Sequence, residues 1–86
     1  NNLPQTALRG QVRLKNQGRA GAVVGVDNMA GRTVTNSDGN WFLYFGMAQA
    51  SASVRVTATL PDQSASKTSA AILQPRATVT VPSFDF

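Results

Sequence analysis

The segment NSDGN, Asn36 to Asn40, is where the residue types of this 86-residue chain come closest to a metal site. Its oxygen-bearing side chains belong to Asn36, Ser37, Asp38 and Asn40. Calcium loops use several carboxylates and a bidentate Glu, whereas this segment has one carboxylate and would need Asp27 from another loop. Asp38-Gly39 also signals a hairpin, because Gly accepts the positive φ that such turns require. We therefore expect Asn36, Asp38 and Gly39 to form a structural turn, with calcium binding as the alternative.

Five large apolar or aromatic residues, WFLYF, follow that turn directly. Successive side chains of a strand point to opposite faces, so if Trp41, Leu43 and Phe45 face a core, Phe42 and Tyr44 face outward. Two neighbouring aromatic side chains on an outer face amount to more than a singly exposed apolar residue, and they indicate a covered or binding surface. We therefore treat Phe42 and Tyr44 as a candidate interaction surface.

Three kinds of contact would account for this aromatic pair. A loop or the C-terminal tail SFDF, Ser83 to Phe86, would cover it within the domain. A neighbouring domain or subunit would pack on it, or a sugar ring would stack on it. Sugar binding also needs polar partners, for which Arg55 and Asn40 are the candidates. All three explanations stay open on the sequence alone.

Arg9, Arg13 and Lys15 lie at alternating positions of one segment and form a basic stripe on a strand face. Such a stripe keeps a surface soluble and protects a sheet edge from other chains. Its alternative role is contact with an acidic partner or a polysaccharide. The net charge of +4 comes from eight basic and four acidic residues, and the basic ones are scattered. Because nucleic-acid binding favours a clustered basic patch, we expect no nucleic-acid partner.

The chain has no His, no Cys and no Glu, and its four Asp residues are isolated in sequence. Nucleophiles of the Ser–His–Asp or Cys–His type therefore cannot be built. Zinc and iron sites with imidazole or thiolate ligands are excluded in the same way. General acid–base catalysis also lacks its usual residues. We predict no catalytic residue, no cofactor and no enzymatic activity.

The candidate residues must be positioned by strands, because apolar side chains recur at every second position through most of the chain. The expected strands are ALRGQVRLK, AVVGVDN, RTVT, WFLYF, SVRVTATL, SASKTSAAIL and RATVTV. The expected turns are NQG (Asn16 to Gly18), DNMAGR, NSDGN and LPDQS, all rich in turn-forming residues. The segment SASKTSAAIL is the least regular of the set, and a single helical turn is its alternative.

About seven short strands separated by turns predict an all-β fold, a seven-stranded antiparallel β-sandwich. The chain is long enough for one small domain, so residues 1–86 are expected to form a single one. No apolar run approaches the roughly 20 residues of a membrane-spanning helix, so we expect no membrane span. The chain opens on NNLPQT without Met, from which we expect a piece of a larger protein.

The order and spacing of several short motifs resemble the carboxypeptidase regulatory-like domain, a transthyretin-like (prealbumin-like) β-sandwich. The matching positions are Gly10 and Val12; Gly21, Ala22, Val24 and Val26; and Thr33, Thr35, Ser37, Asp38, Gly39, Trp41 and Leu43. The match covers roughly the first half of the chain. Arg19 and Ala20 stand where that family usually has a Pro, and AQASASVRV replaces its usual approach to the fifth strand. An immunoglobulin- or fibronectin-like sandwich is the alternative fold.

The resemblance implies a non-catalytic accessory domain, since no catalytic residue of the family is there to be carried over. Such domains belong to larger exported bacterial proteins, which are periplasmic, on the cell surface or extracellular. We therefore expect a structural or interaction module that positions neighbouring domains of the same chain or a protein partner. A carbohydrate-binding module that uses the exposed aromatic residues, with a polysaccharide as its partner, is the alternative function.

Overall fold

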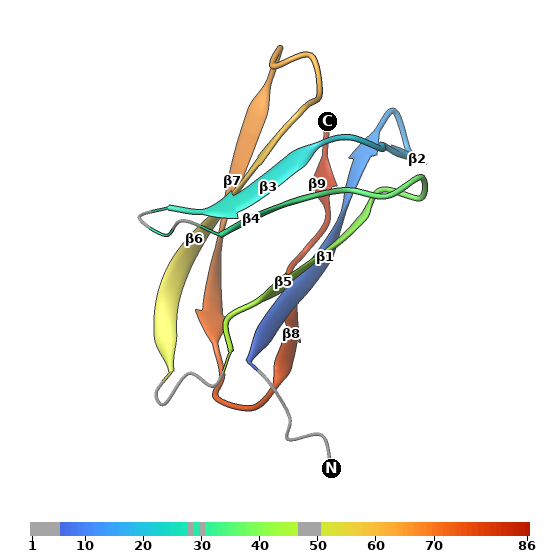
Figure 1. Ribbon diagram of the computed structural model, residues 1–86. Coiled ribbons are helices and arrows are strands. Elements are labelled where there is room, and N and C mark those ends of the chain that lie inside the picture. The colour runs from blue at the N-terminus through green and yellow to red at the C-terminus, as the bar shows by residue number, and fades with distance from the viewer. Residues whose placement is uncertain (1–5, 28, 30, 47–50) are drawn as a thin grey trace.

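A computed structural model describes residues 6–27, 29, 31–46 and 51–86. Over these residues the chain forms strands and turns without a helix, and the strands make two sheets (Figure 1). The strands are β1 (Ala7–Leu14), β2 (Gln17–Gly18), β3 (Val23–Val26), β4 (Arg32–Val34), β5 (Asn40–Tyr44), β6 (Ala52–Thr59), β7 (Ser66–Leu73), β8 (Thr78–Thr80) and β9 (Phe84–Asp85). The all-β class predicted from alternation is confirmed. The segment SASKTSAAIL contains the strand β7, so the alternative of a helical turn is wrong.

Strand β1 is the centre of the first sheet, in which it pairs with four other strands. It pairs antiparallel with β2 and β5, and parallel with β8 and β9. The second sheet has the order β4-β3-β6-β7, and all its pairs are antiparallel. None of the described residues belongs to a helix that is long and apolar enough to cross a membrane.

The parallel pairing of β8 and β9 with β1 corrects the expectation of a purely antiparallel sandwich. After β7 the chain turns at Gln74, whose carbonyl accepts a hydrogen bond from Ala77 N–H, and it crosses to the other sheet. It arrives there beside Ala7, at the start of β1, and then runs in the direction of β1. Side-chain alternation is the same in parallel and antiparallel strands, so the sequence pattern did not contain this information.

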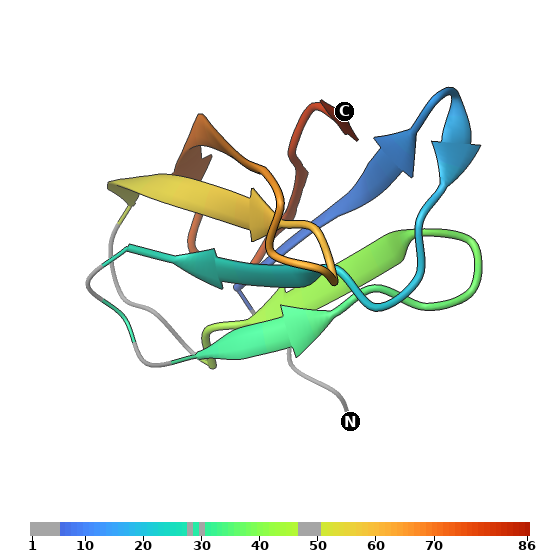
Figure 2. The same cartoon turned by 90° about the horizontal axis from the view of Figure 1, so that it is seen from above.

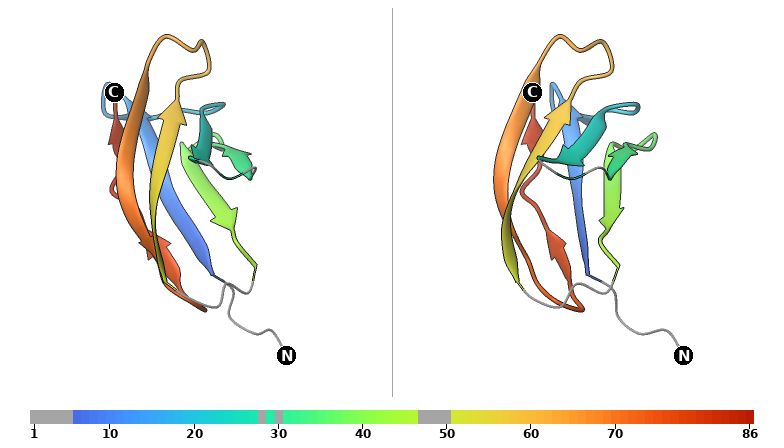
Figure 3. Two further views of the ribbon diagram at one scale, coloured as in Figure 1. Left: turned by 90° about the vertical axis from the view of Figure 1, so that its left-hand side faces the viewer. Right: turned by 60° about the vertical axis from the view of Figure 1, so that its left-hand side comes forward.

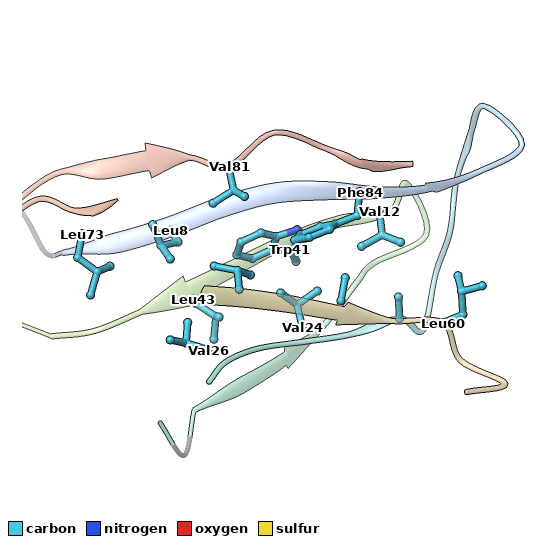
Figure 4. Close-up of a cluster of buried hydrophobic side chains, with 13 residues drawn as sticks. Leu8, Val12, Val24, Val26, Trp41, Leu43, Leu60, Leu73, Val81 and Phe84 are labelled. Carbon is cyan, nitrogen blue, oxygen red and sulfur yellow. The ribbon is translucent and has the colours of Figure 1, made fainter. Parts of the chain in front are cut away.

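The core lies between the two sheets and is built from the inward-facing side chain at every second strand position (Figure 4). The first sheet contributes Leu8, Val12, Trp41 and Leu43, together with Val81 and Phe84 from its C-terminal segment; the second contributes Val24, Val26, Val56, Ala58 and Leu73. Full burial of a side chain such as Leu or Val stabilises the fold by about 1.5–3 kcal/mol. The core is therefore what holds the two sheets, and with them their outer faces, in a fixed relation.

The first turn is not where the sequence predicted it, because it is formed by Lys15 and Asn16 and not by Asn16 to Gly18. The structure closes the β1–β2 hairpin with Lys15 and Asn16, whose φ values are 54° and 67°. Positive φ at both central residues is typical of two-residue hairpin turns. Gly18 lies in β2 instead, where an added Cβ would come within 2.0 Å of the Asp38 carbonyl oxygen. Its small size serves this close approach and not the turn.

Gly10 on β1 gives a test of the core, because it faces the indole ring of Trp41 on β5. A Cβ at Gly10 would lie 2.7 Å from that ring. We expect Gly10→Ala to lower the free energy of unfolding by about 1–3 kcal/mol through overpacking. Gly31→Ala is the matched control, because an added Cβ there meets no described atom within 4 Å. Urea unfolding of both variants measures the difference.

A second substitution identifies the ring as the cause of that loss. The smaller side chain of Trp41→Phe should return part of the stability in the Gly10→Ala background. It also removes the indole N–H, which is buried without a hydrogen-bond partner among the described residues. Equal losses in the Gly10→Ala and Gly31→Ala variants would contradict the packing argument.

Candidate functional site

The strand β5 presents two aromatic side chains on the outer face of the first sheet. Trp41 and Leu43 point into the core, whereas Phe42 is 38% and Tyr44 66% exposed. The two exposed rings lie together, with centroids 4.6 Å apart and planes inclined by 46°. Contiguous exposed apolar patches are the surfaces at which interaction sites are sought, so this pair is the candidate site.

The strand β1 supplies the neighbours of this aromatic pair. In the antiparallel register Arg9 is opposite Phe42 and Ala7 is opposite Tyr44. On its other side Arg9 is paired with Thr80 of β8, and its Nε donates a hydrogen bond of 3.0 Å to Thr80 Oγ1. This bond holds the Arg9 guanidinium on the outer face of β1, which lies between β5 and β8. The outer face thus combines an apolar strand with a positioned cation.

A pocket of about 790 Å³ opens beside Phe42. Its lining includes Arg9, Gln11, Asn40, Phe42, Thr80 and Ser83. Gln11 is opposite Asn40 in the register of β1 and β5, and its side-chain amide donates to the Asp38 carbonyl. Phe42 is therefore bordered by polar donors and acceptors, and Tyr44 lies next to it outside the pocket. We call Phe42, Tyr44, Arg9, Gln11 and Asn40 the outer-face site.

The predicted basic stripe is only partly present. Arg13 is on the same strand face as Arg9, but its Nε lies 3.9 Å from Asp85 Oδ1 and its Nη2 donates to the Asn16 carbonyl. An exposed ion pair of this length contributes little to the stability of the fold. The two contacts nevertheless occupy the Arg13 guanidinium. Lys15 is not on the strand, because β1 ends at Leu14 and Lys15 forms the turn. Arg9 is therefore the cation that the structure places beside the aromatic pair.

Two further expectations about the surroundings of the pair are corrected. The SFDF tail does not cover it, because Phe84 is buried in the core and Phe86 packs against the core. Arg55 is not a neighbour either, because it lies on β6 in the other sheet. Asn40 does lie next to Phe42, since both point outward from β5.

The turn Asn36–Asn40 joins the two sheets. It follows β4 of the second sheet and leads into β5 of the first, so it is not the hairpin that Asp38-Gly39 indicates. The Asn36 side chain organises it, because Asn36 Oδ1 accepts hydrogen bonds from Asp38 N–H at 2.9 Å and Asn40 N–H at 3.0 Å. Gly39 has a φ of 80°, and a Cβ there would lie 2.4 Å from the Val12 carbonyl oxygen. Seen from above, this loop lies next to the β1–β2 hairpin (Figure 2).

The same geometry bears on the calcium alternative. Asn36 Oδ1 already accepts two backbone hydrogen bonds, and the Asp27 carboxylate accepts one from Thr57 Oγ1 on β6. Among the described residues, nowhere do three or more His, Cys, Asp or Glu side chains come together in a way that could hold a metal ion. Asn36 Oδ1 is therefore engaged in holding the loop.

Sequence reasoning missed two buried threonines, Thr35 beside the Asn36–Asn40 turn and Thr6 at the start of β1. Thr35 is buried, and its Oγ1 accepts a hydrogen bond from Ala22 N–H and donates one to the Arg19 carbonyl. Thr6 is buried too, and its Oγ1 accepts from Arg76 N–H. Threonine is equally common on exposed strand surfaces, so neither residue carries a local signal of burial.

Comparison with known proteins adds no relative to this picture. A scan against protein-family models found no match to the chain, and neither did a search of curated proteins. The geometry described above is thus the basis for a functional assignment.

The loop hydrogen bonds predict a difference between two adjacent exposed positions. Asn36→Ala removes the acceptor of two backbone N–H groups, and we expect it to lower the free energy of unfolding by about 1 kcal/mol. Ser37→Ala, whose side chain makes no hydrogen bond to the described residues, should be nearly neutral, and Asn36→Asp should retain most of the stability. Urea unfolding measures all three variants. Equal effects of the two alanine substitutions would show that the Asn36 side chain does not organise the turn.

Proposed function

We propose that this chain is a non-catalytic interaction module of a larger exported or surface protein, and that the outer-face site is its contact with a neighbouring domain or protein partner. The observation that carries the proposal is the exposed Phe42–Tyr44 pair on a rigid strand. Aromatic residues and Arg are enriched at the centres of protein interfaces.

The mechanism is geometric rather than chemical. β5 is hydrogen-bonded to β1, and its inward residues Trp41 and Leu43 are fixed in the core. The outward rings of Phe42 and Tyr44 therefore have limited freedom before they bind, which lowers the entropy lost on association. A partner that contacts them is held at a defined angle to the domain.

The chain is further proposed to be of the transthyretin-like, carboxypeptidase regulatory-like type. Motif positions of that resemblance are in contact in the structure, since Gly10 packs on Trp41 and Gly39 lies against the Val12 carbonyl. Export to the periplasm, the cell surface or the medium follows from the same resemblance. The immunoglobulin- or fibronectin-like sandwich is the competing proposal for the fold type.

Carbohydrate binding is the second candidate function, and the pocket beside Phe42, whose lining mixes polar and apolar side chains, is the observation that favours it. Arg9, Gln11 and Asn40 line the same pocket as Phe42. An aromatic ring bordered by polar groups is the arrangement that a polysaccharide would use.

The two candidates are separated by substitutions in the aromatic pair. In the protein that contains this chain, we expect Phe42→Ser with Tyr44→Ser to weaken assembly by roughly tenfold or more, as loss of interface aromatic residues does. The urea midpoint of the 86-residue chain should change far less, because both rings lie on the outer face and outside the core cluster. Met29→Ser, at an exposed apolar side chain elsewhere, is the control. Analytical ultracentrifugation of the larger protein measures assembly.

Titration with neutral and acidic oligosaccharides, followed by NMR shifts of the Asn40 and Phe42 amides, tests the second candidate. Saturable shifts that vanish in the Phe42→Ser variant would establish sugar binding in place of the protein contact. Unchanged assembly in the double variant would overturn the proposed interaction module.

A further inference from the structure

The strand β7 forms a long free edge on the second sheet, away from the outer-face site (Figure 3). It has eight residues, and among the described residues only those of β6 pair with it. In an antiparallel ladder, every second residue of an edge strand turns its N–H and C=O away from the neighbouring strand. β7 therefore presents a row of unpaired backbone donors and acceptors.

This edge lacks the devices that usually prevent pairing with another chain. Natural edges are blunted with charges, proline, bulges or short length. The charge on β7 is Lys67, whose ammonium donates to the Asp85 carbonyl and lies 5.6 Å from the centre of the Phe86 ring. From Thr68 to Leu73 the strand contains no charged residue and no proline. The edge is thus open to an added strand along most of its length.

A groove of about 490 Å³ lies alongside the free edge. Its lining includes Ala71 and Ile72 of β7, Val79 of β8, and Val81 and Pro82 of the segment after β8. Ile72 is 51% exposed. A strand added to β7 would place every second side chain toward this side of the sandwich, where apolar side chains would fill the groove.

The charges beside the edge indicate which side chains the added strand should carry on the face that points away from the groove. Arg55 of β6 is exposed and lies opposite Ala70 of β7. On this face of the sheet, only the Ala70 methyl group lies between Arg55 and the free edge. β6 and β7 contain no Asp and no Glu. The nearby carboxylate of Asp27 accepts a hydrogen bond from Thr57 Oγ1, and no ion pair joins it to Arg55 among the described residues. Acidic side chains on the outward face of an added strand would therefore meet a cation that is not already paired.

A second copy of the chain fits this edge less well. Each copy carries a net charge of +4. A two-fold pairing of β7 with β7 centred on Ala70 would place two Arg55 side chains on one face, separated only by the two Ala70 methyl groups. Like charges in such positions oppose association.

We propose that the free edge of β7 binds, by strand addition, an extended segment of a partner protein in which apolar residues alternate with acidic ones. Backbone hydrogen bonds to β7 supply affinity, and the alternate side chains supply specificity. The apolar residues enter the groove toward Val79 and Val81, and the acidic residues face Arg55.

The proposal is tested with an alternating Val/Glu peptide of about nine residues, a typical strand length. Amide hydrogen exchange of the 86-residue chain, read by NMR, should slow at every second residue of β7 when this peptide binds. A Val/Lys peptide should bind more weakly by roughly tenfold, the size expected when an attractive exposed charge contact becomes repulsive. Arg55→Glu should reverse the preference between the two peptides, whereas Arg32→Glu, on β4 at the far edge of the same sheet, should not.

The outcomes that overturn the proposal are distinct. If the Val/Glu peptide leaves β7 amides unprotected, strand addition at this edge does not occur. Equal binding of both peptides, or no effect of Arg55→Glu, would contradict the proposal that the partner segment carries acidic residues. Protection of β7 that rises with protein concentration in the absence of peptide assigns the edge to a second copy of the chain.

Discussion

Hydrogen bonding along both edges of β1 is the interaction on which the rest of the structure depends. Val12 donates its N–H to the Gly39 carbonyl and accepts from Arg19 N–H, each at 2.8 Å. On the other side, the carbonyls of Arg9 and Arg13 accept from the C-terminal segment. Because β1 is fixed in this way, its inward residues complete the core while its outward residues lie between the aromatic strand and β8. The outer-face site exists only in this register, since a shift of one residue would reverse both faces.

The close contact between the β1–β2 hairpin and the loop before β5 is a second constraint, and it explains two glycines together. Gly18 and Gly39 lie where two backbones approach each other more closely than any Cβ allows. Glycine is commonly used for such close approach. The loop must also bring the chain from one sheet to the other. It is closed by the Asn36 side chain together with backbone hydrogen bonds from Asn36 N–H to the Asn40 carbonyl and from Gly39 N–H to the Asn36 carbonyl. What the sequence offered as a hairpin signal is therefore a sheet-to-sheet connection.

Side-chain alternation was enough to predict that Phe42 and Tyr44 lie on the opposite face of β5 from Trp41 and Leu43, because strand geometry alone determines it. It did not predict the direction of β8 and β9, which depends on where the chain crosses between sheets. Nor did it place the first turn at Lys15, because the conformational freedom of Gly18 suggested a turn where the structure uses only its small size. Asn40 is a neighbour of Phe42 by alternation along β5 itself, whereas Arg55 is separated from it because β6 belongs to the other sheet, which alternation does not reveal.

The outer-face site and the free edge of β7 belong to different sheets, which has a mechanical consequence for the module. β5 belongs to the sheet centred on β1, whereas β7 is joined by backbone pairing to β6. Packing of side chains such as Trp41 and Val56 is what couples the two sheets. Close-packed interiors transmit strain with little compression. A partner on Phe42 and an added strand on β7 would thus be held at a fixed separation by the core.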